Sequence, residues 1–129
     1  FLLLFVTVGV MAYIRLAPSD PARWHVPVAV RETTDLADGA VRVVPGGQAE
    51  LHRLAQAMAA ADRTRVLSGT VVDGRITYIS RSRVFGFPDY TTLETSDGEV
   101  RAFARLRFGG SDLGVNAARL DRVFAAAGL

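Results

Sequence analysis

Two Asp-Gly pairs punctuate the middle of the chain and leave it little freedom in how to fold. They stand at Asp73-Gly74 and Asp97-Gly98, between stretches in which apolar and polar side chains alternate. Alternation with a period of two indicates half-buried strands, and Asp-Gly suits tight hairpin turns because these turns need positive φ angles. The sequence therefore predicts an antiparallel meander of four strands, at residues 64–72, 75–85, 90–96 and 99–108.

Helical periodicity flanks this meander on both sides. Residues 48–62 place apolar side chains at i, i+3, i+4 and i+7, and residues 113–127 repeat them at intervals of four and three before Gly128. Each segment therefore has one apolar stripe suited to packing on a sheet. A short strand is predicted at residues 41–47. The expected class is α+β, an antiparallel β-meander sheet with two helices packed on one face and a transmembrane helix before it.

The first 14 residues contain neither a charge nor a proline. A helix of that length spans about 21 Å, less than the roughly 30 Å hydrocarbon core of a bilayer. Three interpretations remain: a membrane anchor whose start precedes Phe1, the apolar region of a signal peptide, or a buried core helix. Tyr13 and Arg15 occupy positions typical of an interfacial aromatic and a snorkelling cation, and no small-residue cleavage site follows. An uncleaved anchor is favoured.

Two prolines end the apolar run, and the next residues show no sustained period. Trp24, the only tryptophan, lies in this stretch and is expected to fill the core or rest at the membrane interface; stacking on a ligand is the alternative. The remaining chain is long enough for one modest core. The predicted organisation is a transmembrane anchor at 1–16, an extended linker at 17–40 and an α+β domain at 41–129.

Composition argues against several kinds of site. The chain has no cysteine, which excludes disulfides, zinc–thiolate sites and cysteine nucleophiles. His25 and His52 are the only histidines and no His–x–His pair is present, so no metal site, histidine base or cofactor is expected. All 15 basic residues are arginine, yet the net charge is only +2, which gives little support to nucleic acid as a partner.

Arginines recur on one face of the predicted sheet. Arg101, Arg105 and Arg107 alternate along the last strand, and Arg81 and Arg83 alternate along residues 75–85. If these strands are near neighbours, five guanidinium groups converge. The favoured interpretation is a solvated face whose arginines pair with acids such as Glu94 and Glu99. The alternative is a patch for an anion, a lipid head group or an acidic partner.

Two short motifs, "GFPDY" (86–90) and "GGSDLGVN" (109–116), break the periodic pattern. Gly86 and Pro88 interrupt the ladder, and Asp89 is expected to accept backbone N–H groups in a turn, while Phe85, Phe87 and Tyr90 anchor the corner. Ser111 or Asp112 is expected to cap the last helix, and the Asn116 amide to hold the preceding loop. These are predicted structural joints. Pairing of Asp89 with Asp112, for acid–base chemistry or for Ca²⁺, is the alternative.

The stretches "YISRSRVFGFPDY" and "RAFARLRFGGSDLGVNAARLD", with "MAYIRLAPSDPARWHV" upstream, resemble the domain-of-unknown-function 1499 family of bacterial proteins. The resemblance covers nearly the whole chain. It implies a membrane-tethered or exported domain and brings no established activity. The positions that match the family motifs are Gly86, Phe87, Pro88, Asp89, Tyr90, Ser111, Asp112, Gly114 and Asn116.

These observations predict a membrane-anchored, non-enzymatic domain that acts as an accessory subunit and docks onto a larger membrane protein complex. We expect a single pass through the inner membrane and a periplasmic domain, although Arg15 and Arg23 count toward the opposite orientation. A periplasmic domain that binds a small anion or a lipid is the first alternative; it requires a concave pocket, whereas a docking surface should be flat. A hydrolase that uses Asp89 and Asp112 is the second.

Overall fold

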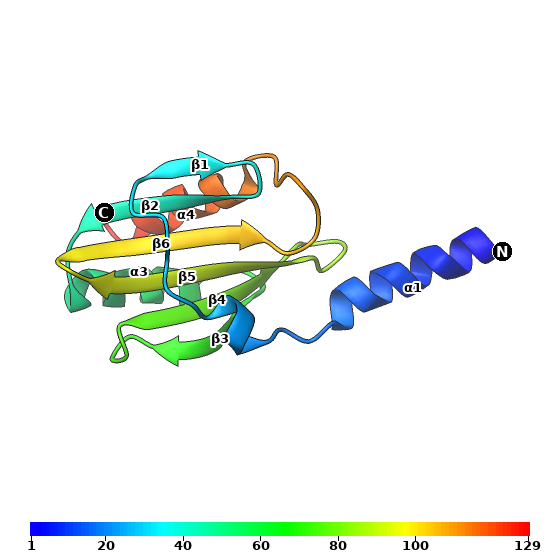
Figure 1. The fold of residues 1–129 in the computed structure, drawn as a ribbon, viewed down its shortest axis with the longest axis horizontal. Helices are drawn as coiled ribbons and strands as arrows, with labels where there is room; N and C mark the ends of the chain where they lie inside the picture. Colours follow the sequence, from blue (N-terminus) through cyan, green and yellow to red (C-terminus); the bar gives the residue numbers. More distant parts are fainter.

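The computed structural model describes residues 1–129 and has an α+β body with a projecting N-terminal helix (Figure 1). Six strands form one antiparallel sheet in the order β1-β2-β6-β5-β4-β3. The predicted class and the meander β3–β6 are confirmed, and β2 extends it by pairing with β6. The strands are β1 Thr34–Leu36, β2 Gly39–Pro45, β3 Thr64–Thr70, β4 Arg75–Arg81, β5 Pro88–Ser96 and β6 Glu99–Leu106; the helices are α1 Leu2–Leu16, α2 Pro21–Trp24, α3 Gln48–Ala59 and α4 Val115–Ala126.

The two Asp-Gly turns differ in backbone geometry. Asp97 and Gly98 both have positive φ, 57° and 77°, as a tight hairpin of the predicted kind requires. At the β3–β4 turn only Gly74 does, with φ of 79°. Both pairs nevertheless join antiparallel strands, so the predicted connections are confirmed.

The main core lies between the sheet and the two helices α3 and α4, which cover the same face (Figure 1). The small side chains of Ala102 and Ala104 on β6 leave room for the larger apolar side chains of the helices. The Tyr78 hydroxyl donates to the carbonyl of Ala55 at 3.2 Å, and burial raises the pKa of Tyr78 to about 12. The helix residues buried here are Leu51, Leu54 and Met58 of α3 and Leu120, Val123 and Phe124 of α4.

Residues 17–40, predicted as an extended linker, also pack on the sheet and contribute a strand to it. Trp24 of α2 stacks on Tyr90 of β5, with ring centroids 4.0 Å apart, and Val28 is buried with its N–H bonded to Glu94 of the same strand. Residues further along this stretch form β1 at the sheet edge. We call residues 17–30 the covering segment, because they lie across the face opposite α3 and α4 (Figure 1). The core role expected for Trp24 fits this placement.

Helix α1 projects away from the body and has no buried residue (Figure 1). Only its last turns touch the body: the Tyr13 ring meets the Phe108 ring edge to face, with centroids 6.1 Å apart, and the Arg15 side chain lies beside Gly86. The core-helix interpretation is therefore wrong. Helix α1 has 15 residues, and no helix in the structure is both long and apolar enough to cross a bilayer, so the transmembrane part of the predicted class is not supported.

The close approach of β2 to β6 provides a test of the sheet. A Cβ atom on Gly39 would lie 2.2 Å from the carbonyl oxygen of Ala104. Gly39→Ala should therefore lower the free energy of unfolding by about 2 kcal/mol or more, measured by urea denaturation. Gly110→Ala is the matched control, because its Cβ would meet nothing within 4 Å. Equal stability of the two variants would show that the β2–β6 register is wrong.

Candidate functional site

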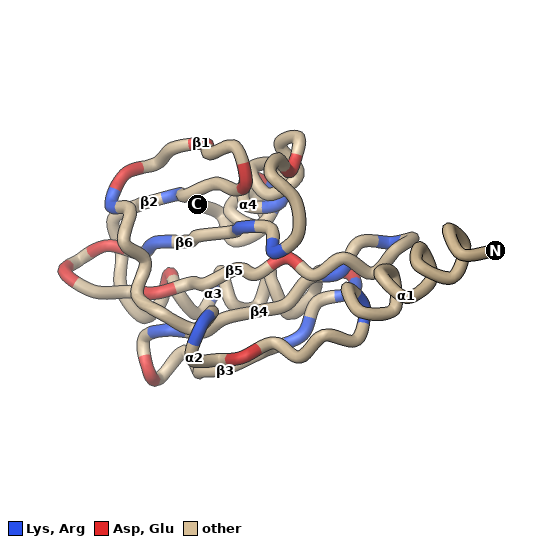
Figure 2. Tube along the Cα trace, turned by 45° about the vertical axis from the view of Figure 1, so that its right-hand side comes forward, with Lys and Arg blue, Asp and Glu red and all other residues tan.

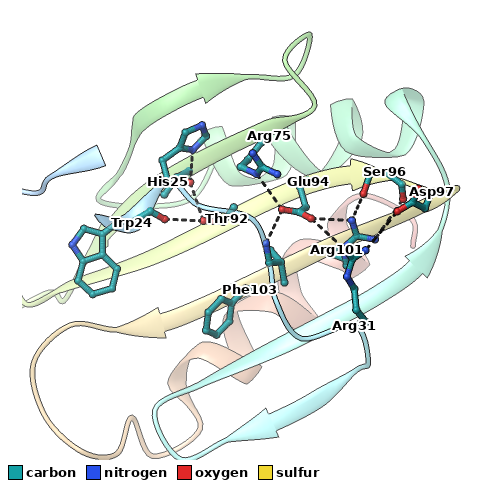
Figure 3. Close-up of polar contacts among 12 residues, drawn as sticks. Trp24, His25, Arg31, Arg75, Thr92, Glu94, Ser96, Asp97, Arg101 and Phe103 are labelled. Carbon is teal, nitrogen blue, oxygen red and sulfur yellow. Dashed lines mark hydrogen bonds and ion pairs between the residues drawn. The ribbon is translucent and has the colours of Figure 1, made fainter. Parts of the chain in front are cut away.

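Polar groups on the second face of the sheet converge on Glu94 (Figure 3). Its Oε1 accepts the backbone N–H of Val28 at 2.8 Å and Nε of Arg75 at 3.1 Å. Its Oε2 accepts Nε and Nη2 of Arg101, at 3.1 and 2.9 Å. Arg75, Glu94 and Arg101 stand directly opposite one another on β4, β5 and β6. One carboxylate thus joins three strands to the covering segment.

The charges of Glu94 and its arginine partners indicate that this cluster stabilises the fold. Burial acts to raise the pKa of Glu94, but the Val28 N–H and the guanidinium groups of Arg101 and Arg75 together hold it below its ordinary value of 4.5. Arg101 is 0% exposed, so Glu94 is the charge that balances it inside the protein. Removing one partner of such a pair leaves the other charge buried and uncompensated.

Arg105 and Arg107 are held by neutral acceptors rather than by acids. Arg105 donates to the hydroxyl of Thr92 at 2.8 Å and to the carbonyls of Phe103 and Trp24, and burial lowers the pKa of Arg105 to about 10. Arg107 donates to the carbonyl of Pro18 at 2.9 Å and to the Tyr90 hydroxyl at 3.1 Å. Both arginines therefore fix the covering segment to the sheet.

The five arginines predicted to converge do not form one exposed patch. Arg101 and Arg105 are buried beneath the covering segment, and Arg107 is half-buried against it. Arg83 lies exposed in the β4–β5 loop. Pairing with Glu94 and Glu99, expected of a solvated face, does occur for Arg101, but on a face covered by chain. Of the five, only Arg81 lines the hollow described below.

The motif residues instead meet on the helix side, at the end of the sheet from which α1 leaves. Asp89 Oδ2 accepts Nδ2 of Asn116 and Nη1 of Arg119, both at 3.3 Å. The expected backbone contacts of Asp89 are thus replaced by side-chain donors of α4. Asp112 does serve the start of α4, since its carboxylate accepts the N–H groups of Gly114 at 2.9 Å and Asn116 at 3.0 Å. Buried Asn116 therefore links the two acids.

The other motif residues shape the loops around this link. Gly86 and Gly114 have positive φ, 71° and 80°, in the turns before β5 and α4. The Ser111 hydroxyl accepts the Leu113 N–H at 3.3 Å, and Pro88 is buried at the start of β5. The structure corrects one expectation: Phe85 is 53% exposed and does not anchor the corner, whereas Phe87 is half-buried and Tyr90 fully buried.

Two hollows, of about 450 and 340 Å³, share four arginines between the sheet and α4. We call them together the arginine cleft. Arg63 comes from the α3–β3 connection, Arg81 from the end of β4, and Arg119 and Arg122 from α4. Figure 2 shows arginine segments gathered at the end of β3 and β4 near α1. Lining acids are Asp62, Asp89 and Asp112, so Asp89 and Asp112, predicted as independent joints, share one hollow.

Three of the four guanidinium groups carry no ion pair. Arg119 pairs with Asp89, whereas Arg63, Arg81 and Arg122 form no salt bridge. Arg63 Nε donates to the Arg81 carbonyl at 3.2 Å, and the Arg81 N–H donates back to the Arg63 carbonyl at 3.0 Å. Arg63 also holds a left-handed backbone with φ of 51°, which is costly for a residue with a side chain. Its place beside Arg81 is thus fixed by the fold.

The pKa of Asp89 reflects opposing influences within the cleft. Burial raises the pKa of Asp89 above its ordinary value; the Arg119 charge and the Arg119 and Asn116 hydrogen bonds offset part of this, and the Asp112 charge adds to it. Only Oδ2 accepts side-chain hydrogen bonds. The cleft therefore combines excess positive charge with one carboxylate that is costly to ionise.

Arg63, Arg119 and Arg122 were not among the functional residues predicted from the sequence. The last two follow Asn116 at intervals of three on the predicted helix, off its apolar stripe, so this spacing was an available signal. The sequence around Arg63 gave no such signal, because the position of Arg63 depends on the turn between α3 and β3. Its partner Arg81 lies 18 residues further along the chain.

A family model described as "Protein of unknown function (DUF1499)" matches residues 18–126. The chain belongs to this family. The resemblance seen in the sequence is thereby confirmed, and the match includes residues 18–30 of the covering segment and the arginine cleft of this DUF1499 domain. No curated protein matches it. A crystal structure of a DUF4468 family protein from Bacteroides ovatus is similar with 12% identity and a TM-score of 0.38; the similarity covers 68% of this chain and 63%, less than two thirds, of the other.

The cluster around Glu94 predicts a pH-dependent stability. Glu94→Gln should lower the free energy of unfolding by about 3 kcal/mol at pH 7, because it leaves Arg101 buried without its charge partner. The wild type should lose this contribution as the pH falls from about 4.5 through the lowered pKa of Glu94, whereas the variant should not. Asp97→Asn, in the exposed 3.7 Å pair with Arg31, is the control and should cost less than about 0.5 kcal/mol. Equal losses would show that Glu94 is not structurally central.

Proposed function

We propose that this DUF1499 chain is a non-enzymatic domain that binds an anionic group in the arginine cleft, at the surface of a membrane with which α1 associates. The observation that carries the proposal is the presence of three guanidinium groups without ion pairs, Arg63, Arg81 and Arg122, around one hollow. Arginine offers parallel N–H donors to carboxylate and phosphate oxygens and keeps its charge at all physiological pH values.

The shape of the site favours a ligand over a flat docking surface. The larger hollow, about 450 Å³, also carries the hydroxyls of Thr64 and Ser80, which are hydrogen-bonded to each other at 2.8 Å. Its arginines come from separate elements, so they approach the space from the sheet and from α4. A phosphate-type anion, whose oxygens point in several directions, suits such a set better than a planar carboxylate.

The composition of α1 supports the membrane part of the proposal. Its side chains up to Arg15 are apolar except for Thr7, whose hydroxyl donates to the Leu3 carbonyl at 2.8 Å within the helix, and Tyr13, which lies in the last turns beside the body. A helix whose polar groups are satisfied internally suits an apolar environment. The same helix would serve the accessory-subunit role predicted from the sequence, but the concave cleft favours ligand binding as the domain's own function.

A hydrolase based on Asp89 is the second candidate. Its support is the half-buried carboxyl group, with a raised pKa, in the same hollow as Asp112 and the arginines. Asp112, however, already uses both carboxylate oxygens to hold the start of α4. A single carboxyl group beside a basic cleft is explained by binding alone, because it moderates the positive charge.

Loss of one unpaired arginine should weaken anion binding. Arg122→Gln is the cleanest variant, because Arg122 forms neither a salt bridge nor a side-chain hydrogen bond in the fold. Its affinity for inorganic pyrophosphate, measured by calorimetry, should fall about three- to tenfold. Arg31→Gln makes the same charge change at the β5–β6 end and should bind like wild type. Failure of wild type to bind pyrophosphate, or equal affinities of both variants, would refute the anion cleft.

Removal of the Asp89 charge should act in the opposite direction. Asp89→Asn keeps the side-chain shape and an acceptor for Arg119, while it removes a negative charge from the cleft. Pyrophosphate affinity should rise about two- to fivefold. The hydrolase candidate makes a different prediction: p-nitrophenyl phosphate should be turned over by wild type and not by this variant. Weaker binding by Asp89→Asn would contradict the charge-moderating role.

A further inference from the structure

Large apolar side chains are exposed on two loops at the end of the body from which α1 leaves. Val84 and Phe85, in the β4–β5 loop, are 72% and 53% exposed, and Leu113, in the β6–α4 loop, is 91% exposed. These side chains have no polar group that would favour contact with water. We call Val84, Phe85 and Leu113 the apolar rim. A group of this kind at one end of a domain marks a contact with a membrane or a partner.

The apolar rim borders the arginine cleft. Ser82 and Phe87, from the same loop as Val84, line the smaller hollow, and so do Ser111 and Val115, which flank Leu113. Phe85 stacks on Phe87 with ring centroids 5.5 Å apart, which gives the loop tip a fixed apolar surface. The cleft therefore opens between two loops that each end in an apolar side chain.

Helix α1 emerges at the same end. Arg15 lies against Gly86 of the β4–β5 loop, and Tyr13 contacts Phe108 at the start of the β6–α4 loop. The exposed side chains of α1, the apolar rim and the cleft thus belong to one end of the molecule, and the β3–β4 and β5–β6 turns lie at the other (Figure 1).

Charge at this end is suited to an anionic surface. Arg15, Arg65 and Arg83 are exposed without an ion pair, next to the arginine cleft. Of the nearby acids, Asp89 is paired with Arg119, Asp112 holds the start of α4, and Asp62 remains exposed. Figure 2 shows blue segments predominating where β3 and β4 approach α1. Each basic residue near an anionic leaflet adds to the attraction.

We propose that this end of the domain sits on an anionic bilayer, where the arginine cleft receives the phosphate of a lipid head group. The apolar rim enters the upper acyl region and α1 lies within the lipid on the same side. The inference rests on the proposed function, because the cleft must bind an anion. A soluble phosphate would require the arginines but not the exposed Phe85 and Leu113; a lipid requires both kinds of contact.

Vesicle flotation of the full chain tests this assignment. Wild type should partition to phosphatidylcholine vesicles that contain phosphatidylglycerol at least about tenfold better than to phosphatidylcholine alone, and less so at high salt. The double variant Phe85→Ser/Leu113→Ser should lose at least about tenfold in partition to the anionic vesicles while it keeps the pyrophosphate affinity of wild type. Arg122→Gln should weaken both kinds of binding.

Val72→Ser is the matched control, because Val72 is 89% exposed at the opposite, β3–β4, end. It should leave both kinds of binding unchanged. Equal partition of wild type to neutral and anionic vesicles, or equal partition of the rim and Val72 variants, would overturn the lipid inference while pyrophosphate binding left the anion cleft standing. Absence of pyrophosphate binding would overturn the cleft itself.

A second measurement separates the rim from α1. In bicelles with a spin label on the acyl chain, the methyl signals of Val84 and Leu113 should broaden, and those of Val72 should not. Far-UV circular dichroism checks that each variant keeps the fold. Rim signals that remain sharp while α1 signals broaden would show that the helix alone meets the lipid, and would overturn the proposed orientation.

Discussion

The carboxylate of Glu94, opposite the fully buried guanidinium of Arg101, is the contact on which the arrangement of this molecule depends. The Coulombic attraction is strong only because the pair is shielded from water, and the shielding is supplied by the segment that the same carboxylate holds through the Val28 N–H. The covering segment and the Glu94–Arg101 ion pair therefore stabilise one another. Neither the bare sheet with an exposed Glu94 nor a covered sheet with a neutral residue there would have the same stability.

This mutual dependence determines where other parts of the chain lie. Trp24 is placed over Tyr90, and the carbonyl of Trp24 supplies an acceptor for Arg105, which has no acid of its own. The stretch that precedes α2 lies at the end of the sheet where Asp89 and α4 meet, because Arg107 holds the Pro18 carbonyl there. The arginine cleft and the root of α1 therefore become neighbours, although their residues are far apart in the sequence.

Periodicity was sufficient to predict the meander β3–β6, the strand β2 and the two packed helices, because alternation, helical stripes and Asp-Gly turns are all local signals; β1 fell within the predicted linker. The covered face escaped prediction for a physical reason. Arg105, Thr92 and Thr77 give the same polar pattern whether water or another segment lies above them. Only their hydrogen bonds to one another and to Trp24 and His25 of the covering segment distinguish the two cases. Asp89 shows the same limit, since its partners Asn116 and Arg119 lie 27 and 30 residues away. The cleft was accordingly predicted only in part, through Arg81 and the motif acids.

The short connection between α1 and α2 has a mechanical consequence. The Ser19 hydroxyl shares a 2.6 Å hydrogen bond with the Tyr90 hydroxyl, and the adjacent Pro18 carbonyl accepts a hydrogen bond from Arg107. The connection at residues 17–20 is therefore held to the body at Pro18 and Ser19, which restricts rotation of α1 relative to the sheet. A tilt of α1 would therefore be transmitted to the central strands, and the α+β body would rotate together with the helix.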